Sequence, residues 1–377
     1  MTEAERLRRN GGLKWTQFGE GVLPGWVAEM DFGLAPSVTA ALHEAVDRGL
    51  TGYPYPIAEE RTARAATRFW SDRFGWEVDP GWVFPAPDVV EGIRRAIEKL
   101  TRPGSPVVLH TPVYHPFFGM VERAGRDLIE VRSNRDDDGL YRLNIDAIDR
   151  ALDDGAGSIV VCNPWNPTGR VLTPTELGDL LEVAAAHDAR VLADEIHSPI
   201  IYEGHRHTPL ASLDPDRVVT VASASKAWNL PGLKCAQVVL TNESDRGIWA
   251  DYFTPDKVGV GTFGLFASTA AYEDGVGWFD DVLVKLESNR DLVVSRMAER
   301  LPEAPMAVPQ GTYLAWIDMT GFDLGDPADF LLEHAGVAVT GGGPFGSGGS
   351  GFIRLNFATE AGILTEMIDR IAAAVSR

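Results

Sequence analysis

Lys226 is the residue of this chain whose type and surroundings most directly indicate covalent chemistry. It ends the stretch Ser223 to Lys226, where its three predecessors are Ser, Ala and Ser. The β-branched run Val218 to Val221 just before it predicts a buried strand. A lysine beyond a strand end, with no bulky neighbours, can reach a carbonyl carbon and form a Schiff base.

Asp194 follows a second apolar run, Val191 to Ala193, and stands three residues before His197. A carboxylate at a buried strand end costs free energy unless it meets a cation. A protonated pyridine nitrogen would be such a cation, and the carboxylate would hold the positive charge on the ring. Two plainer interpretations stay open, in which Asp194 caps the next helix and His197 is a structural histidine.

A third segment, Asn163 to Gly169, carries two Asn-Pro steps directly after the apolar run Ile159 to Val161. Each step restricts the backbone and favours a tight turn. A single step would indicate only a turn, whereas two steps that end in Thr168-Gly169 indicate part of a strand-end site.

Arg354 lies in the apolar stretch Gly351 to Asn356, after a glycine-rich segment that begins at Gly341. A buried guanidinium needs an anion, and its parallel N–H groups suit a carboxylate. A structural ion pair is the alternative. The glycine-rich segment is expected to form a mobile loop beside a site.

Groups that could bind a phosphate also occur near these segments. Ser223 and Ser225 carry hydroxyl groups, and Lys234 is a second cation close to Lys226 in the sequence. A helix expected to open at Val90 would supply backbone N–H groups.

Alternating strands and helices must position these residues. Short apolar runs alternate with helical periodicity through the middle of the chain, which predicts an α/β domain around a mostly parallel sheet. In such sheets, ligands sit outside the carboxyl ends of the strands. The expected strands are 107–109, 128–131, 159–161, 191–193, 218–221 and 237–240, and the expected helices include 36–49, 59–74, 90–100 and 175–187. Residues 1–35 are expected to form an irregular arm.

Composition excludes several classes of protein. The 377 residues carry a formal net charge of −20, which repels nucleic acids and anionic membrane surfaces. The two cysteines, Cys162 and Cys235, form neither a disulfide framework nor a metal site, so we expect no metal. No signal peptide or membrane-spanning run is recognisable, so we expect a cytoplasmic protein.

Together, these motifs resemble the class I/II aminotransferase family, which binds pyridoxal 5′-phosphate in fold type I. Further segments resemble its MalY/PatB-type branch of cystathionine β-lyases, also called cysteine-S-conjugate β-lyases. These segments are Trp26 to Phe32, Pro112 to Phe117, Gly169 to Val171, Asp194 to His197, Ser225 to Gly232 and Thr312 to Asp318.

The resemblance implies an α/β fold with a mostly parallel seven-stranded sheet between helices and a smaller α+β domain. The N-terminal arm and part of the small domain would comprise residues 1–45. The large cofactor-binding domain would comprise 46–275, and the C-terminal small domain 276–377. The resemblance also implies a homodimer and a role in amino-acid metabolism, in methionine biosynthesis.

The resemblance also implies a role for each site residue. Lys226 would bear the cofactor and move the Cα proton, and Asp194 would pair with the ring nitrogen. Asn166 and His197 would lie near the phenolic oxygen, and Tyr114 would stack on the ring. Phosphate contacts would come from Val89, Val90, Ser223 and Lys234, and from Tyr53 of the neighbouring subunit. Arg354, Asn166 and the backbone near Ala28 would bind the substrate carboxylate.

Three positions depart from the branch. Asp88 stands where glycine is usual, Glu29 where aspartate is commoner, and Lys234 is less suited than arginine to a bidentate phosphate contact.

The implied reaction is an α,β-elimination that releases a thiol, pyruvate and ammonia from cystathionine or a related cysteine S-conjugate. The first alternative is an aminotransferase with a keto-acid acceptor. A cofactor-binding regulator is the second, although no helix-turn-helix or basic patch precedes the fold.

Overall fold

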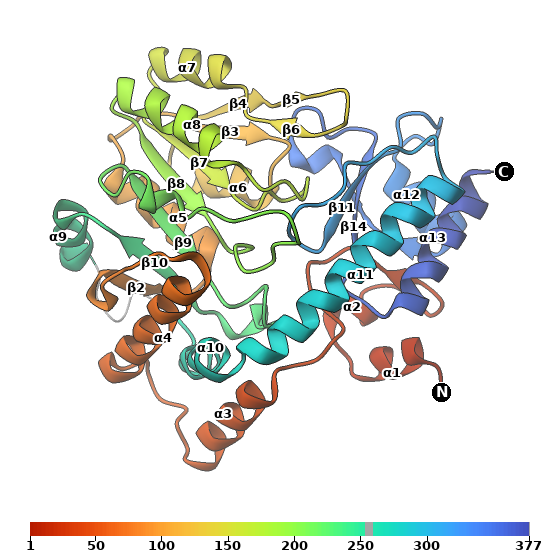
Figure 1. The fold of residues 1–377 in the computed structure, drawn as a ribbon, viewed down its shortest axis with the longest axis horizontal. Helices are drawn as coiled ribbons and strands as arrows, with labels where there is room; N and C mark the ends of the chain where they lie inside the picture. Colours follow the sequence, from red (N-terminus) through yellow and green to blue (C-terminus); the bar gives the residue numbers. More distant parts are fainter. Residues whose placement is uncertain (253–258, 377) are drawn as a thin grey trace.

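A seven-stranded sheet forms the centre of the computed structural model, which describes residues 1–252 and 259–376 (Figure 1). Strand order is β2-β10-β9-β8-β7-β3-β4, and of these seven strands β10 alone runs in the opposite direction to the others. The strands are β2 (Val83–Ala86), β3 (Val107–Thr111), β4 (Leu128–Arg132), β7 (Ser158–Cys162), β8 (Arg190–Asp194), β9 (Val218–Ala222) and β10 (Ala236–Leu240). The mostly parallel sheet predicted from the sequence is confirmed.

Helices cover both faces of this sheet, which explains why its central strands are buried along almost their whole length and are mostly apolar. Alternate residues of β7 pack in opposite directions, Ile159 and Val161 into one buried cluster and Val160 and Cys162 into the other. One cluster includes α5 (Val89–Leu100) and α6 (Pro116–Arg123). The other includes α4 (Pro56–Phe74), α7 (Ile145–Asp153) and α8 (Pro174–Ala186).

A second, smaller layer adjoins this core. Its sheet has the antiparallel order β11-β14-β13, formed by β11 (Leu314–Asp318), β14 (Phe352–Asn356) and β13 (Thr340–Gly341). The long helix α11 (Val276–Arg300) runs from α10 (Thr262–Asp274) to α13 (Ala361–Val375) and links the two layers (Figure 1). Helix α12 (Pro327–Ala335) packs on α13, and α10 also packs on α3 (Pro36–Asp47).

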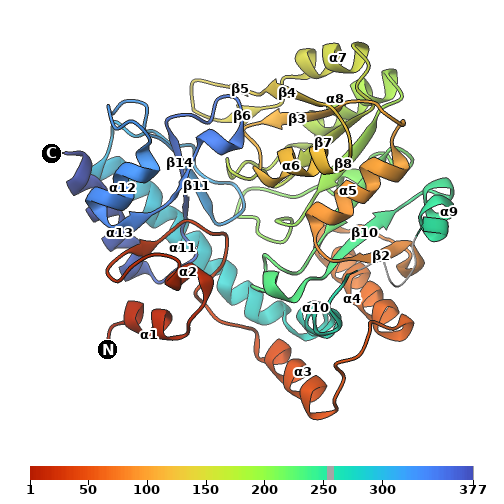
Figure 2. The ribbon, with the colours of Figure 1, turned by 180° about the vertical axis from the view of Figure 1, so that it is seen from behind.

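The N-terminal segment lies against the small layer (Figure 2), because β1 (Leu23–Pro24) pairs with β12 (Val337–Ala338). The prediction that residues 1–35 are irregular is wrong in three places, since α1 (Glu3–Arg9), α2 (Leu13–Thr16) and the short strand β1 form there. The reason for α1 is a capping box, in which Thr2 and Glu5 satisfy each other's backbone N–H groups. The structure also contains α9 (Glu243–Tyr252), a β5 (Asn134–Arg135)–β6 (Tyr141–Arg142) hairpin and several short 3-10 helices.

The parallel strands place the candidate residues at one edge of the sheet. Asn163 follows β7, Asp194 ends β8 and Ser223 follows β9, so all three stand at carboxyl ends. In the described ranges 1–252 and 259–376, no helix is long and apolar enough to cross a membrane.

Candidate active site

The Lys226 amine lies in the turn after β9 and donates a hydrogen bond to the Ala28 carbonyl oxygen at 2.9 Å. Burial lowers the pKa of Lys226 to about 8, and the nearby positive charge of Arg354 acts in the same direction. The negative charges of Glu29 and Asp194 partly oppose both effects. At neutral pH this amine is therefore neutral far more often than an ordinary lysine.

Asp194 is a buried carboxylate at the end of β8, only 4% exposed. The Ile196 N–H donates to its Oδ1 at 3.0 Å, and the Cys162 thiol donates to its Oδ2 at 3.6 Å. Burial raises the pKa of Asp194 to about 6 against these two hydrogen bonds. No lysine, arginine or histidine of the described residues forms an ion pair with Asp194.

Arg354 on β14 is buried without a carboxylate partner among the described residues. Its guanidinium donates to Asn166 Oδ1 and to the Trp26 carbonyl, each at 3.0 Å, and to Thr340 Oγ1 at 3.3 Å. It also lies 5.1 Å from the centre of the Phe345 ring. Burial lowers the pKa of Arg354 to about 10, so it stays charged at neutral pH. A buried cation held only by neutral groups is suited to an external carboxylate.

His197 is buried close to these groups, and its Nδ1 has no hydrogen-bond partner in the described structure. Burial lowers its pKa well below the ordinary value, and the charges of Lys226 and Arg354 lower it further. The imidazole is therefore neutral and retains hydrogen-bonding capacity for a ligand.

Three of the candidate phosphate-binding residues lie at the start of α5, since Val89 and Val90 form its first turn and Lys234 pairs with its N-cap residue, Asp88. Asp88 caps this helix, because its Oδ1 accepts the Glu91 N–H at 2.8 Å. Its other oxygen lies 3.0 Å from Lys234 Nζ, so the expected phosphate cation already has an internal anion. The Ser223 hydroxyl donates to the Cys235 carbonyl at 2.7 Å.

Two predicted tyrosines occupy different environments. Tyr114 is half-buried, its ring packs edge-on against Phe117 at 5.6 Å, and burial raises its pKa. Tyr53 is 94% exposed in the loop between α3 and α4, and the fold of one chain does not bring it into the cluster around Lys226.

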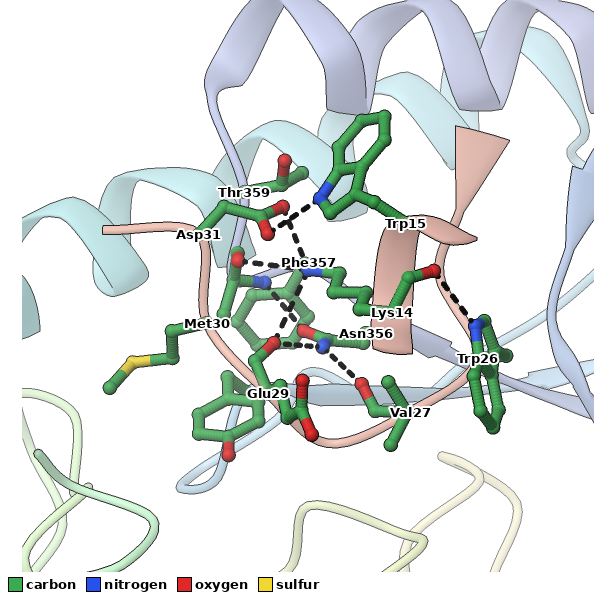
Figure 3. Close-up of polar contacts among 12 residues, drawn as sticks. Lys14, Trp15, Trp26, Val27, Glu29, Met30, Asp31, Asn356, Phe357 and Thr359 are labelled. Atoms are coloured by element: carbon green, nitrogen blue, oxygen red, sulfur yellow. Dashed lines mark hydrogen bonds and ion pairs between the residues drawn. The ribbon is translucent and has the colours of Figure 1, made fainter. Parts of the chain in front are cut away.

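An irregular segment, Trp26 to Asp31, contains the Ala28 carbonyl that accepts from Lys226, and we call this segment the strap. Figure 3 shows Trp26, Val27, Glu29, Met30 and Asp31 of the strap with their polar contacts. Side chains distant in sequence hold its carbonyl groups: Tyr313 donates to Ala28 at 2.9 Å, and Asn356 to Val27 and Glu29 at 2.6 Å each. Sequence reasoning missed both residues. Asn356 could have been found, because strand alternation puts it on the same face as Arg354.

These observations fit pyridoxal phosphate. The unpaired Asp194 carboxylate suits a ring cation, Arg354 suits a carboxylate, and the orphaned His197 Nδ1 suits a polar ring substituent. The first turn of α5 offers N–H groups that have no partner within the helix. Among residues 1–252 and 259–376, no group of His, Cys, Asp and Glu side chains could hold a metal ion.

Known proteins share this architecture. The chain matches the family described as Aminotransferase class I and II over residues 15–374. It is 38% identical over 375 residues to the Cystathionine beta-lyase of Corynebacterium glutamicum, covering 98% of each chain. It is 34% identical over 376 residues to Cystathionine beta-lyase PatB of Bacillus subtilis, covering 97% of this chain and 96% of that one.

A solved structure of the PLP-bound C-S lyase from Staphylococcus hominis matches with a TM-score of 0.91 at 26% identity, covering 98% of this chain and 97% of that one. The seven-stranded sheet, with a lysine and a buried carboxylate at its strand ends, defines a fold type I protein of the pyridoxal-phosphate class. The chain belongs to the class I and II aminotransferase family. The fold and family predicted from the sequence are confirmed.

Asp88→Asn should tighten cofactor binding. The amide would keep the cap on α5, but it would remove a negative charge beside the predicted position of a doubly charged phosphate and would free Lys234. We expect the dissociation constant of pyridoxal phosphate, measured by titrating cofactor-free protein, to fall on the order of 10-fold. Asp326→Asn is the matched control, because Asp326 also caps a helix, α12, but forms no ion pair with Lys234. Unchanged or weaker binding by Asp88→Asn would contradict the prediction.

Proposed function

We propose that this chain is a pyridoxal-phosphate-dependent carbon–sulfur β-lyase. It would cleave cystathionine or a related cysteine S-conjugate to a thiol, pyruvate and ammonia. The observation that carries the proposal is the 34–38% identity, over at least 96% of each chain, to proteins named cystathionine β-lyase. The cluster of Lys226, Asp194 and Arg354 supports it.

Two titratable groups would move and stabilise charge. Lys226 and Asp194 would hold pyridoxal phosphate, which would supply an electron sink for the negative charge that develops at the substrate Cα. Lys226, with a pKa lowered to about 8, is a base of suitable strength to take the Cα proton. Asp194 would keep a positive charge on the ring nitrogen, because no cationic side chain in the described part of the chain forms an ion pair with its carboxylate.

Arg354 would orient the substrate by binding its α-carboxylate bidentately. Asn166 and the Trp26 carbonyl fix the guanidinium, so little rotamer freedom is lost on binding. With the carboxylate fixed, the Cα–H bond can be held toward the Lys226 amine, and the thiolate leaves from Cβ. Ala28, on the strap, would border the same carboxylate.

We also propose a homodimer in which Tyr53 reaches the phosphate of the neighbouring subunit. Three large side chains near the start of α4 or on α3 are unusually exposed in the single chain, namely Tyr53 at 94%, Ile57 at 74% and Val46 at 58%. An apolar surface of this kind is typical of an interface.

We infer the same domain division as the sequence predicts: an arm and part of the small domain at 1–45, a large domain at 46–275 and a small domain at 276–377. Pairing of β1 with β12 supports assigning the N-terminal segment to the small domain. A cytoplasmic location and a place in methionine biosynthesis complete the proposal.

The purified protein should release pyruvate and a thiol from cystathionine without any keto acid. Lys226→Ala should lower turnover by more than about 1,000-fold, because the base and the cofactor attachment are both lost. Lys99→Ala, at the far end of α5, is the control and should keep wild-type turnover. Turnover that requires a keto acid and yields little pyruvate would identify an aminotransferase instead.

Mixing two impaired variants tests the shared site. If Tyr53 acts across a dimer interface, Tyr53→Phe and Lys226→Ala should each be impaired alone. Co-expressed, they should form hybrid dimers in which one of the two sites carries both wild-type residues, and pyruvate release should rise well above the sum of the separate variants. Activity equal to that sum, or a mass of one chain in sedimentation, would overturn the dimer proposal.

A further inference from the structure

The strap is held by side chains rather than by a strand ladder. Each carbonyl from Trp26 to Met30 accepts at least one side-chain hydrogen bond, although no helix or strand includes these residues. The donors are Arg354 and Thr340 for Trp26, Asn356 for Val27, Lys226 and Tyr313 for Ala28, Asn356 and Lys14 for Glu29, and Asn229 for Met30. The position of the strap therefore depends on side-chain anchors.

One anchor comes from the N-terminal arm and uses two consecutive residues of α2. Lys14 Nζ lies 2.8 Å from Asp31 Oδ2, and Trp15 Nε1 donates to Asp31 Oδ1 at 2.8 Å, so both carboxylate oxygens are occupied (Figure 3). The Lys14 amine also donates to the carbonyls of Glu29 at 3.2 Å and Ala358 at 3.4 Å. We call Lys14, Trp15 and Asp31 the arm clamp.

The arm clamp is almost completely removed from water. The side chains of Lys14 and Asp31 are 3% and 4% exposed. A buried ion pair gains little net stability, because the cost of desolvating both charges offsets their attraction. A protein with apolar residues of similar volume in place of such a pair is often equally stable. An ion pair, by contrast, fixes the distance and the orientation between its two side chains. This points to positioning rather than stability as the contribution of the clamp.

The clamp is linked to Lys226 through a short stretch of backbone. Asp31 is three residues from Ala28, whose carbonyl accepts from the Lys226 amine at 2.9 Å. Glu29, held by Lys14, is the residue directly after Ala28. Arg354 depends less on the clamp, because Asn166 and Thr340 also hold its guanidinium.

We propose that Lys14 and Trp15 are positioning residues that, through Asp31, set the Ala28 carbonyl at the place where it fixes the Lys226 amine. The N-terminal arm is thereby part of the active site without touching substrate or cofactor. The proposal rests on the proposed role of Lys226 as the group that bears the cofactor and moves the Cα proton.

A variant with an apolar clamp separates positioning from stability. In Lys14→Met/Trp15→Phe/Asp31→Leu, no buried charge or indole N–H is left without a partner. The Glu29 carbonyl keeps Asn356 as its donor, and the Ala358 carbonyl keeps the Asp31 backbone N–H. We expect an unfolding midpoint near that of the wild type. Turnover per cofactor-loaded site should nevertheless fall 10- to about 100-fold, with KM changed less than about 3-fold because Arg354 keeps its other anchors.

A second readout does not depend on which reaction the enzyme catalyses. The rate at which Lys226 condenses with added pyridoxal phosphate, followed by absorbance, depends on the fraction of neutral amine. The Ala28 carbonyl accepts from this amine and favours its charged form, so its displacement should move the midpoint of that pH profile down by about 0.5 to 1 pH unit. Asp31→Asn should shift the midpoint in the same direction.

The matched control is Asp245→Asn, which removes the charge from another buried ion pair. Asp245 is 5% exposed and pairs with Arg190 at the start of β8, the opposite end from Asp194. It should lower the unfolding midpoint as Asp31→Asn does, but leave the Lys226 profile unchanged.

An apolar-clamp variant that is stable and has wild-type turnover and a wild-type pH profile would overturn the proposal. If that variant does not fold, the single variant Trp15→Phe serves as the test. A lowered midpoint of its Lys226 condensation profile would support the proposal, and a wild-type midpoint would overturn it. Failure of the wild type to release pyruvate would refute the proposed lyase and leave the condensation test of the clamp intact.

Discussion

A buried carboxylate without a cation of its own is the constraint on which the rest of this structure depends. Asp194 ends a parallel strand and is nearly inaccessible to water, and within residues 1–252 and 259–376 only a backbone N–H and a thiol donate to it. Such a group is tolerated when the fold is stabilised elsewhere and a ligand supplies the missing charge. The buried and mostly apolar strands on either side, covered by helices on both faces, provide that stability.

Two cations without a carboxylate partner among the described residues share the site with this carboxylate: Lys226, after β9 of the large sheet, and Arg354, on β14 of the small sheet. Arg354 is buried and Lys226 is half-buried, and desolvation lowers the pKa of each, to about 10 and about 8. Neutral oxygens from the strap and from Asn166 hold them apart. The arrangement keeps a basic amine, a carboxylate-binding guanidinium and a ring-binding carboxylate ready, at a cost in stability that a bound cofactor would offset.

Much of this site could be predicted from the sequence, because its main residues adjoin recognisable strands. Asp194 and Lys226 follow apolar runs directly, and Arg354 interrupts a third. The contacts of the strap could not be predicted. Ala28 and Lys226 are 198 residues apart in the sequence, and no local sequence pattern indicates a hydrogen bond between them. The same holds for Lys14 with Asp31, and for Asp88, whose carboxylate turns to Lys234 while it caps α5. The composition of residues 1–35 also gave no indication of α1 and α2. Their formation depends on capping and tertiary contacts rather than on a periodic pattern of apolar residues.

The most direct test is the stability of cofactor-free Asp194→Asn relative to wild type across pH. A folded-state pKa raised from 3.8 to about 6 means that Asp194 favours folding below about pH 4 and loses that contribution as the pH rises through 6. In urea unfolding, the account predicts equal stability near pH 4 and a variant more stable by up to roughly 3 kcal/mol above pH 6. Saturating pyridoxal phosphate should reverse the order. A variant less stable than wild type at every pH without cofactor would contradict the claim that Asp194 is an uncompensated charge.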